Sequence, residues 1–227
     1  MINTLDLENN CFLIEYKIFS NLGDKGSYRF SQTIYGELSV SDEMGNNKKT
    51  IGKLTGEKLL LNEARNHNWD SQSIFDNEAH TLEIGEAIYD FDYEDWHDNI
   101  KNKFDEEIYE NDLLILSRIE ILPKYQGKGI GQKWIKDFYI NFIQGCGLMA
   151  LKVFPLQCES DYTLGRDQNW CDEMKYSNME KGGDAFESLL KFYLKIGFQI
   201  FPEISKKIVF INPFLRNEKF EQIKFDL

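Results

Sequence analysis

The segment that most constrains the fold is residues 113–122 (LLILSRIEIL), which ends at Pro123. Its first half is apolar on both faces, which is typical of a central strand covered on both sides. A short glycine-rich turn follows, and residues 130–143 then place one apolar stripe on a helix, formed by Trp134, Ile135, Phe138 and Phe142. Residues 148–154 are again a buried-type strand. This order of strand, glycine loop, helix and strand predicts a βαβ unit.

The flanking sequence predicts further strands and helices around this unit. In the N-terminal third, turn-forming residues separate three β-rich segments: 11–20, 28–40 and 50–61. Residues 76–104 have helical periodicity with a break near Asp92, which predicts two helices. After the βαβ unit we expect a long aperiodic segment, a helix closed by Gly197 and two short strands, at residues 155–184, 185–196, 198–201 and 207–211.

Acidic residues are concentrated in one part of the chain. The 227 residues carry a formal net charge of −12. Residues 76–112 contain 14 acidic side chains against Lys101 and Lys103, so this segment alone has a balance of −12. Such a field repels phosphate backbones and attracts cations, which disfavours nucleic acid as a partner and favours a basic ligand. The simpler explanation of the same residues is a solvated, solubilising helical face.

Cysteine, histidine and hydropathy patterns indicate the compartment. Four cysteines with no CxxC pair fit reduced thiols in the cytoplasm. The longest purely aliphatic runs have four residues, whereas a membrane span needs about 20. Residues 1–10 contain no Lys or Arg, so they lack the basic start of a signal peptide. His67, His80 and His97 have no HExxH or paired spacing, and we expect no metal site.

The segment that indicates chemistry is the glycine loop at residues 123–131 (PKYQGKGIG), between the buried strand and the helix. Its main-chain N–H groups lie open at a helix N-terminus, where unpaired donors and the helix dipole favour an anion such as phosphate. The dinucleotide fingerprint GxGxxG would need glycine where Gln132 stands, and the Gly-Lys-Ser/Thr of a Walker loop is absent. A nucleotide-binding protein and a purely structural glycine turn are the competing interpretations.

A second motif, Tyr193-x-x-x-Gly197-Phe198, follows about 60 residues later, where a helix enters a strand. Together with Gln126-x-x-Gly129-x-Gly131, it resembles the signature of the GNAT superfamily of acyl-CoA-dependent N-acyltransferases over residues 112–213. The resemblance implies a mixed α/β (α+β-like) fold: a twisted, mostly antiparallel sheet, flanked by helices and splayed at its central strands. It also implies one domain of residues 1–227, with a divergent N-terminal half (1–111) and an acetyl-CoA-binding core (112–213).

The resemblance assigns roles to residues of the loop and of its strand. The coenzyme A pyrophosphate would lie on the amides of Gln126, Gly127, Lys128, Gly129, Ile130 and Gly131. The pantetheine arm would pair with backbone near Ile119 and Ile121, and the Ile121 N–H would polarise the acetyl carbonyl. Tyr193 would protonate the leaving thiolate, and a packed aromatic is the alternative for this residue.

The base that deprotonates the acceptor is less defined. Glu120, one residue from Ile121, is the first candidate, although an ion pair with Arg118 on the same strand face would explain it equally well. Glu159 and a water-mediated route are the alternatives. No residue resembles an activated nucleophile, so direct attack within a ternary complex is expected.

Three features depart from the family pattern. Phe186 stands where many members have an Asn that contacts pantetheine. Three strands precede the acidic helices, and residues 155–184, with Tyr162, Trp170 and Tyr176, form a candidate acceptor lid. Trp96 and Trp170 either line an acceptor pocket or pack, and Cys158 and Cys171 are more typical of buried small hydrophobes than of nucleophiles.

The sequence therefore predicts an N-acetyltransferase that uses acetyl-CoA as co-substrate and needs no metal. Its expected partner is a small-molecule or peptide amine, with a cationic acceptor as a hypothesis from charge alone. A homodimer is left open, and neither nucleic acid nor membrane is expected. The alternative is a non-catalytic acyl-CoA-binding or protein-interaction module with the same fold.

Overall fold

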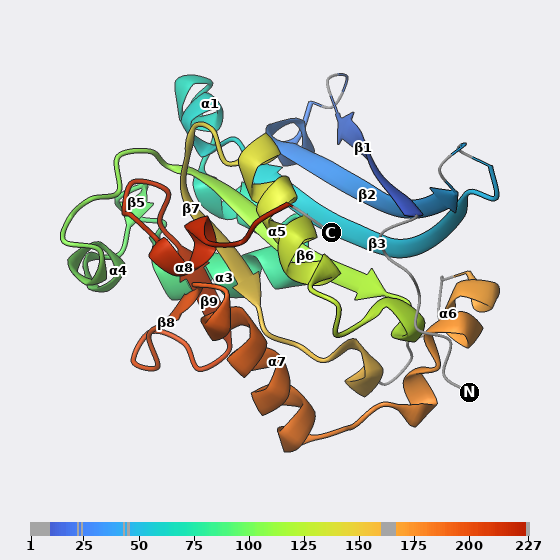
Figure 1. Cartoon of the computed structure of the whole chain (residues 1–227). Coiled ribbons are helices and arrows are strands. Elements are labelled where there is room, and N and C mark those ends of the chain that lie inside the picture. The colour runs from blue at the N-terminus through green and yellow to red at the C-terminus, as the bar shows by residue number, and fades with distance from the viewer. Residues whose placement is uncertain are drawn as a thin grey trace.

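The computed structural model describes residues 10–21, 23, 25–42, 44, 46–159 and 167–225. A seven-stranded sheet has the strand order β1-β2-β3-β6-β7-β9-β8 (Figure 1). Its strands are β1 (Asn10–Ser20), β2 (Ser31–Asp42), β3 (Lys49–Leu59), β6 (Asp112–Ile121), β7 (Cys146–Lys152), β8 (Gln199–Ile200) and β9 (Ile208–Ile211). All neighbouring pairs are antiparallel except β6 and β7, which are parallel. The architecture is thus mixed α/β, with a mostly antiparallel sheet flanked by helices.

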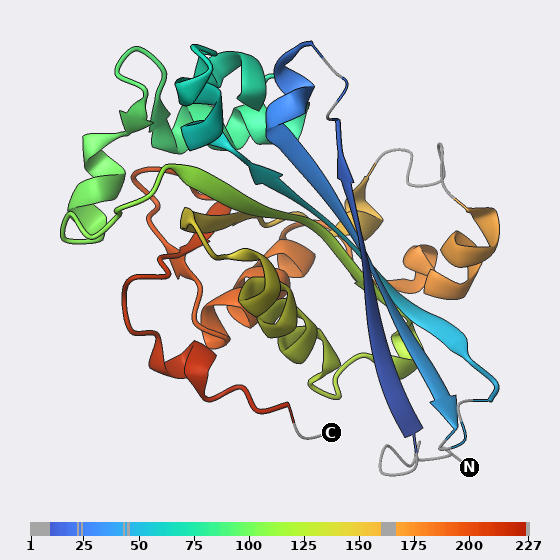
Figure 2. The same ribbon diagram turned by 90° about the horizontal axis from the view of Figure 1, so that it is seen from above.

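Helices cover both faces of the sheet. Between β3 and β6 lie α1 (Leu61–Asn66), α2 (Ser71–Phe75), α3 (Ala79–Ile88), the small hairpin of β4 (Tyr89–Asp90) and β5 (Asp95–Trp96), and α4 (Asp98–Lys103). Helix α5 (Ile130–Phe142) joins β6 to β7, and α6 (Gln168–Met174), α7 (Gly183–Lys195) and α8 (Glu218–Glu221) follow. Figure 2 shows α5 and α8 on one side of the sheet and α6 on the other.

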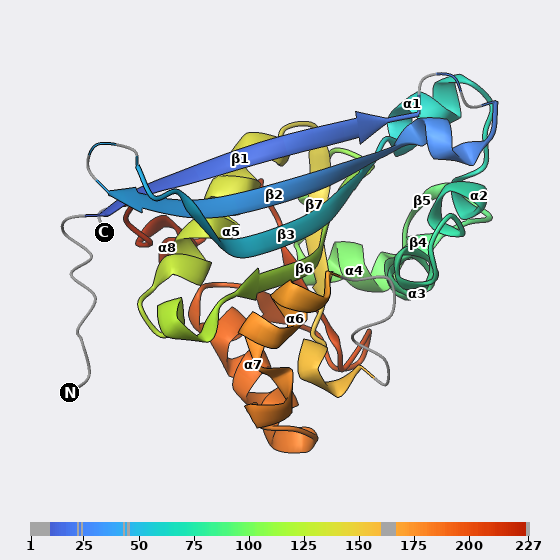
Figure 3. The same ribbon diagram turned by 90° about the vertical axis from the view of Figure 1, so that its right-hand side faces the viewer.

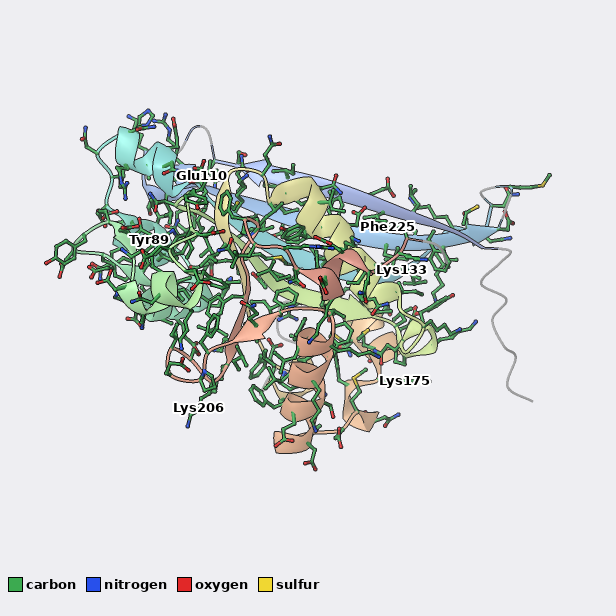
Figure 4. All side chains as sticks on the ribbon, turned by 60° about the vertical axis from the view of Figure 1, so that its left-hand side comes forward. Tyr89, Glu110, Lys133, Lys175, Lys206 and Phe225 are labelled. Carbon is green, nitrogen blue, oxygen red and sulfur yellow. The ribbon has the colours of Figure 1, made fainter. Side chains whose placement is uncertain are left out.

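Alternation along the strands sends apolar side chains into two cores. Leu114 and Leu116 of β6 pack in one core with Trp134 and Phe138 of α5. Their neighbours Leu113 and Ile115 pack in the other core, with the helices between β3 and β6. In Figure 4, Tyr89 lies among the dense side chains of that helical layer, while Phe225 lies on the other side near α5. A strand that is buried on both faces therefore forms the centre of the molecule, as its sequence predicts.

The predicted elements are largely confirmed. The three N-terminal strands, the two helices on either side of Asp92, the βαβ unit, the helix before Gly197 and the last two strands are all present. Gly197 closes α7 with a φ of +108°. Figure 3 shows the long β1, β2 and β3 side by side above β6.

Several local predictions were wrong. Residues 28–30 belong to a 3₁₀ turn, η1 (Ser27–Phe30), rather than to β2. The short helices α1 and α2 were not predicted, because five or six residues show too little periodicity. Part of the segment expected to be an aperiodic loop forms α6 and the 3₁₀ turns η3 (Leu156–Cys158) and η4 (Tyr176–Asn178). Tyr162 of that segment, and the N-terminal nine residues, lie outside the described residues.

The splay of the two central strands positions the candidate site. Parallel pairing of β6 with β7 ends at Ile115 and Ala150, while β6 continues to Ile121. A β-bulge contributes to this bend: Thr55 pairs with Arg118 and Gly56 with Leu116, so Ser117 has no opposite residue in β3. Beyond the bulge, β6 has β3 on one edge and an opening on the other.

Within the described residues, no helix has the length and apolar character that crossing a bilayer would require.

Candidate functional site

A cavity of about 650 Å³ occupies the opening between β6 and the end of β7. Its lining comes from β6, the glycine loop, residues 152–157 after β7, the η4 region and the inner face of α7. The volume is typical of a site for a small molecule or a cofactor arm. The cavity joins residues that lie far apart in the sequence, such as Glu120 and Tyr193, which are 73 positions apart and both line it.

The glycine loop closes one end of this cavity. Gly127 and Gly129 have φ values of +72° and +78°, which turn the chain sharply before α5. Among the described residues, the main-chain N–H groups of residues 127–132 have no hydrogen-bond acceptor. Gly127, Gly129 and Gly131 line the cavity, as does Gln126, whose Nε2 donates to the Ile121 carbonyl at 2.7 Å. The loop is therefore a row of open donors at a helix N-terminus, suited to an anion.

Two predicted loop residues are not among those that line the cavity. Ile130 is buried in the core that contains α5, so only its main-chain N–H belongs to the donor row. Lys128 is half-buried, beside the cavity rather than in its wall. Its side chain would contribute by charge at short range.

The open edge of β6 presents main-chain groups to the cavity. Leu122 N–H donates to the Ile51 carbonyl at 2.9 Å, so it points toward β3. Because main-chain direction alternates along a strand, the N–H groups of Ile119 and Ile121 point the opposite way, into the opening. This orientation agrees with the predicted role of these two residues, and the cavity wall includes both.

Tyr193 lies on the opposite wall, near the C-terminal end of α7. Only 5% of the residue is exposed, and its ring makes edge contacts with Phe192 and Phe198. Among the described residues its hydroxyl has no hydrogen-bond partner. Burial raises the pKa of Tyr193 above its ordinary value, so the phenol is protonated at neutral pH. The raised pKa keeps the phenol protonated, and it makes the phenol a weaker acid than a free tyrosine.

Glu120 lines the cavity on the face of β6 that Arg118 shares. It is 5% exposed, and the Tyr176 hydroxyl of η4 donates to its Oε1. Arg118 instead pairs with Glu159, with 2.8 Å between Nη2 and Oε1. The Arg118–Glu120 ion pair that the sequence left open is thus replaced by two cross-segment contacts, Tyr176–Glu120 and Arg118–Glu159. Both join β6 to the segment that was expected to be a lid.

A second polar cluster adjoins the cavity at the bulge. Ser117 lines the cavity, and its Oγ donates to Oε2 of Glu57 in β3. His80 of α3 places Nε2 3.1 Å from Ser117 Oγ and 3.3 Å from Glu57 Oε2. The hydrogen bond with Glu57 raises the pKa of His80 above its ordinary value, although burial opposes this rise. A buried carboxylate, a hydroxyl and an imidazole therefore meet beside the cavity.

Sequence reasoning missed these partners for a physical reason. Tyr176, Glu57 and Ser117 are single polar residues in otherwise unremarkable segments, and their contacts cross 37 to 60 positions. Polar residues in the buried strands β3 and β6 were the available signal, because buried polar groups require partners.

The other residues that the sequence singled out are not among those that line the cavity. Trp96 is in the core, where its Nε1 donates to the Glu110 carbonyl at 2.9 Å. Trp170 packs under Lys53, whose Nζ lies 4.5 Å from the ring centroid, and is not among the cavity-lining residues. Phe186 packs against the core, Cys171 is buried and Cys158 is half-buried. In the described part of the chain, no group of three or more His, Cys, Asp or Glu side chains could hold a metal ion.

Comparisons with protein-family models, with curated proteins and with solved structures found no match to this chain.

Proposed function

We propose that this protein is an N-acetyltransferase of the GNAT type, which transfers an acetyl group from acetyl-CoA to an amine. The observation that carries the proposal is the cavity at the β6–β7 splay. Open main-chain N–H groups at a helix N-terminus close one end, unpaired strand amides form one wall, and a buried tyrosine is part of the lining. These are the three features that a thioester donor ending in a pyrophosphate-linked nucleotide would use.

Donor binding would follow from the main chain. The N–H groups of residues 127–132 would hold the pyrophosphate, which the N-terminal end of the α5 dipole favours. The pantetheine amides would pair with the open edge of β6 near Ile119 and Ile121. Gly129, at φ +78°, forms the left-handed turn at the start of α5, which would place these N–H groups around the anion.

The chemistry would be direct acyl transfer. A neutral amine attacks the thioester carbon, the new C–N bond forms, and negative charge on the carbonyl oxygen is stabilised by the Ile121 N–H. The C–S bond then breaks, the attacking nitrogen loses its extra proton to water, and the CoA thiolate takes the phenolic proton of Tyr193, which regains a proton from water. Glu120 lies in the same cavity and would hold the incoming ammonium close to the donor.

Thermal unfolding tests donor binding directly. Acetyl-CoA at about 100 times its Kd should stabilise the protein by about 2.7 kcal/mol and raise the midpoint by roughly 5 to 10 °C. CoA should act similarly, whereas ATP and NAD are the controls for a nucleotide-binding loop. If neither acetyl-CoA nor CoA shifts the midpoint, the proposal fails.

The competing function is a non-catalytic acyl-CoA-binding or interaction module. It predicts the same thermal shift with no acetylated product from any amine. A screen of amine acceptors by mass spectrometry of products, run at the acetyl-CoA concentration that saturates the shift, separates the two functions.

A further inference from the structure

The cluster of Ser117, Glu57 and His80 connects the cavity to solvent. Ser117 is in the cavity wall, Glu57 is buried at 8% exposure, and the side chain of His80 is 35% exposed. Their contacts are consecutive: Ser117 Oγ donates to Glu57 Oε2, and the same carboxylate oxygen is 3.3 Å from His80 Nε2. Three groups that can each pass on a proton therefore meet between the cavity wall and the partly exposed imidazole.

Glu120, the carboxylate in the cavity wall, is less suited to releasing a proton to solvent. It is buried, and Oε1 accepts a hydrogen bond from Tyr176, which is itself 2% exposed. A group that takes a proton from the acceptor in every turnover must release that proton before the next. A partly exposed imidazole, with an ordinary pKa close to neutrality, is the side chain best suited to that release.

We infer that the proton lost by the acceptor ammonium leaves the cavity through Ser117 and Glu57 to His80. This inference rests on the proposed function. The ammonium gives one proton to Ser117 Oγ while the Ser117 hydroxyl proton passes to Glu57 Oε2. Glu57 then gives this proton to neutral His80 at Nε2, and the imidazolium releases it to water, so every group returns to its starting state.

The geometry differs from a nucleophilic serine site. In a serine triad, the serine and the carboxylate bind opposite nitrogens of the histidine. Here Ser117 and Glu57 both lie near Nε2 of His80, at 3.1 and 3.3 Å. Ser117 also donates to the carboxylate, an arrangement that suits proton transfer along the chain rather than attack on an acyl group.

The relay predicts a pH dependence, because His80 must be neutral to accept the proton. Three charged groups surround it: Glu57 of β3 and Glu78, the residue before α3, raise its pKa, while Lys152 of β7 lowers it. The balance places the pKa of His80 above its ordinary value. The rate should therefore fall as the pH falls through that raised pKa.

The experiment combines rate–pH profiles with histidine NMR on the full chain. We expect His80→Gln to lower kcat by about 10²-fold at neutral pH and to remove the acidic limb of the profile, while acetyl-CoA still raises the unfolding midpoint. Glu57→Gln should lower the His80 pKa measured from its ring-proton shifts, because it removes the principal stabiliser of the imidazolium. That NMR measurement needs no turnover.

His97→Gln is the matched control. His97 lies in the same helical layer, its side chain is 34% exposed, and its Nδ1 is 3.8 Å from Asp90 Oδ2. This variant should keep both kcat and the acidic limb. If His80→Gln keeps them as well, the relay is wrong while the acetyltransferase proposal stands. If the wild-type chain binds acetyl-CoA but acetylates no amine, the relay and the catalytic proposal both fail.

Discussion

The hydroxyl of Tyr176 donates a hydrogen bond to Oε1 of Glu120, and both residues are at most 5% exposed. This contact joins η4 to the central strand at the wall of the cavity. Because a buried carboxylate without partners is costly, the contact fixes the Glu120 side chain and closes one side of the site. This wall of the cavity is thus built by a segment that has no periodic sequence signal.

Tyr176→Phe removes the donor and leaves the ring in place. We expect a loss of about 1 to 3 kcal/mol in the free energy of unfolding and a higher KM for the amine, with acetyl-CoA affinity unchanged. Urea denaturation and acceptor-dependent kinetics measure the two effects. Tyr16→Phe is the control, because Tyr16 donates to Asp137 at 2.8 Å and neither residue lines the cavity. It should lose similar stability without any change in KM, and a KM change in both variants would contradict the assignment.

Tyr193→Phe tests the proton donor. The hydroxyl has no partner among the described residues, so its removal should leave stability nearly unchanged. If it protonates the thiolate, kcat should fall by about 10² or more, with the acetyl-CoA thermal shift intact. Tyr139→Phe serves as comparison, since burial also raises the pKa of Tyr139, to about 12, and its ring packs on Phe220 rather than on the cavity. Full activity of Tyr193→Phe would exclude the acid role.

Gly129→Ala and Gly145→Ala form a matched pair. Both glycines have left-handed φ values, +78° and +80°, and an added Cβ at either would meet no atom closer than 3.4 Å. Each substitution should therefore cost about 1 kcal/mol through backbone strain alone. Only Gly129→Ala should also weaken acetyl-CoA binding, because it disturbs the main-chain N–H groups of the glycine loop. Isothermal titration calorimetry of both variants measures the affinity for acetyl-CoA. Equal affinities would show that the glycine loop does not hold acetyl-CoA.

The sequence was sufficient for the parts of the site that are local. The order of strand, glycine loop and helix predicted open main-chain N–H groups near Gly129, and the second motif singled out Tyr193, and both residues line the cavity. It was insufficient where contacts depend on tertiary packing. Glu120 was expected beside Arg118 because strand alternation puts them on one face, yet each pairs across segments, with Tyr176 and Glu159. A pattern with a period of two fixes which residues share a face, but not which loop covers them.

Alkaline pH should destabilise the fold through buried tyrosines. Burial is the principal cause of a raised pKa at five of them: Tyr16, Tyr89, Tyr139, Tyr176 and Tyr193. The folded chain keeps these phenols neutral, so their stabilisation is complete below the unfolded pKa of about 10. It is lost as the pH rises above 10, because only the unfolded chain releases the protons.

Above pH 10, each such tyrosine makes the free energy of unfolding fall by about 1.4 kcal/mol more per pH unit. Urea unfolding between pH 8 and 11 (roughly the range over which a phenol ionises) should show a shallower decline for Tyr193→Phe than for the wild type. An identical decline in the two proteins would mean that Tyr193 ionises in the folded state as easily as in the unfolded one.

The preference for a positively charged acceptor should depend on Glu120 rather than on the acidic segment, residues 76–112. Glu120 is the one carboxylate among the described residues that line the cavity, where Arg118 and Lys152 are held by Glu159 and Glu83. The acidic segment packs over the other sheet face, so its exposed charges act on the acceptor only at long range and are screened by salt. The measured quantity is kcat/KM for a diamine divided by kcat/KM for an amine of equal length with a neutral end group. Glu120→Gln should therefore reduce this ratio about tenfold, a change of about 1.4 kcal/mol. Glu86→Gln, an exposed site in α3, should leave the ratio unchanged at 0.15 M salt (a Debye length of about 8 Å). The reverse result would assign acceptor selection to the acidic surface.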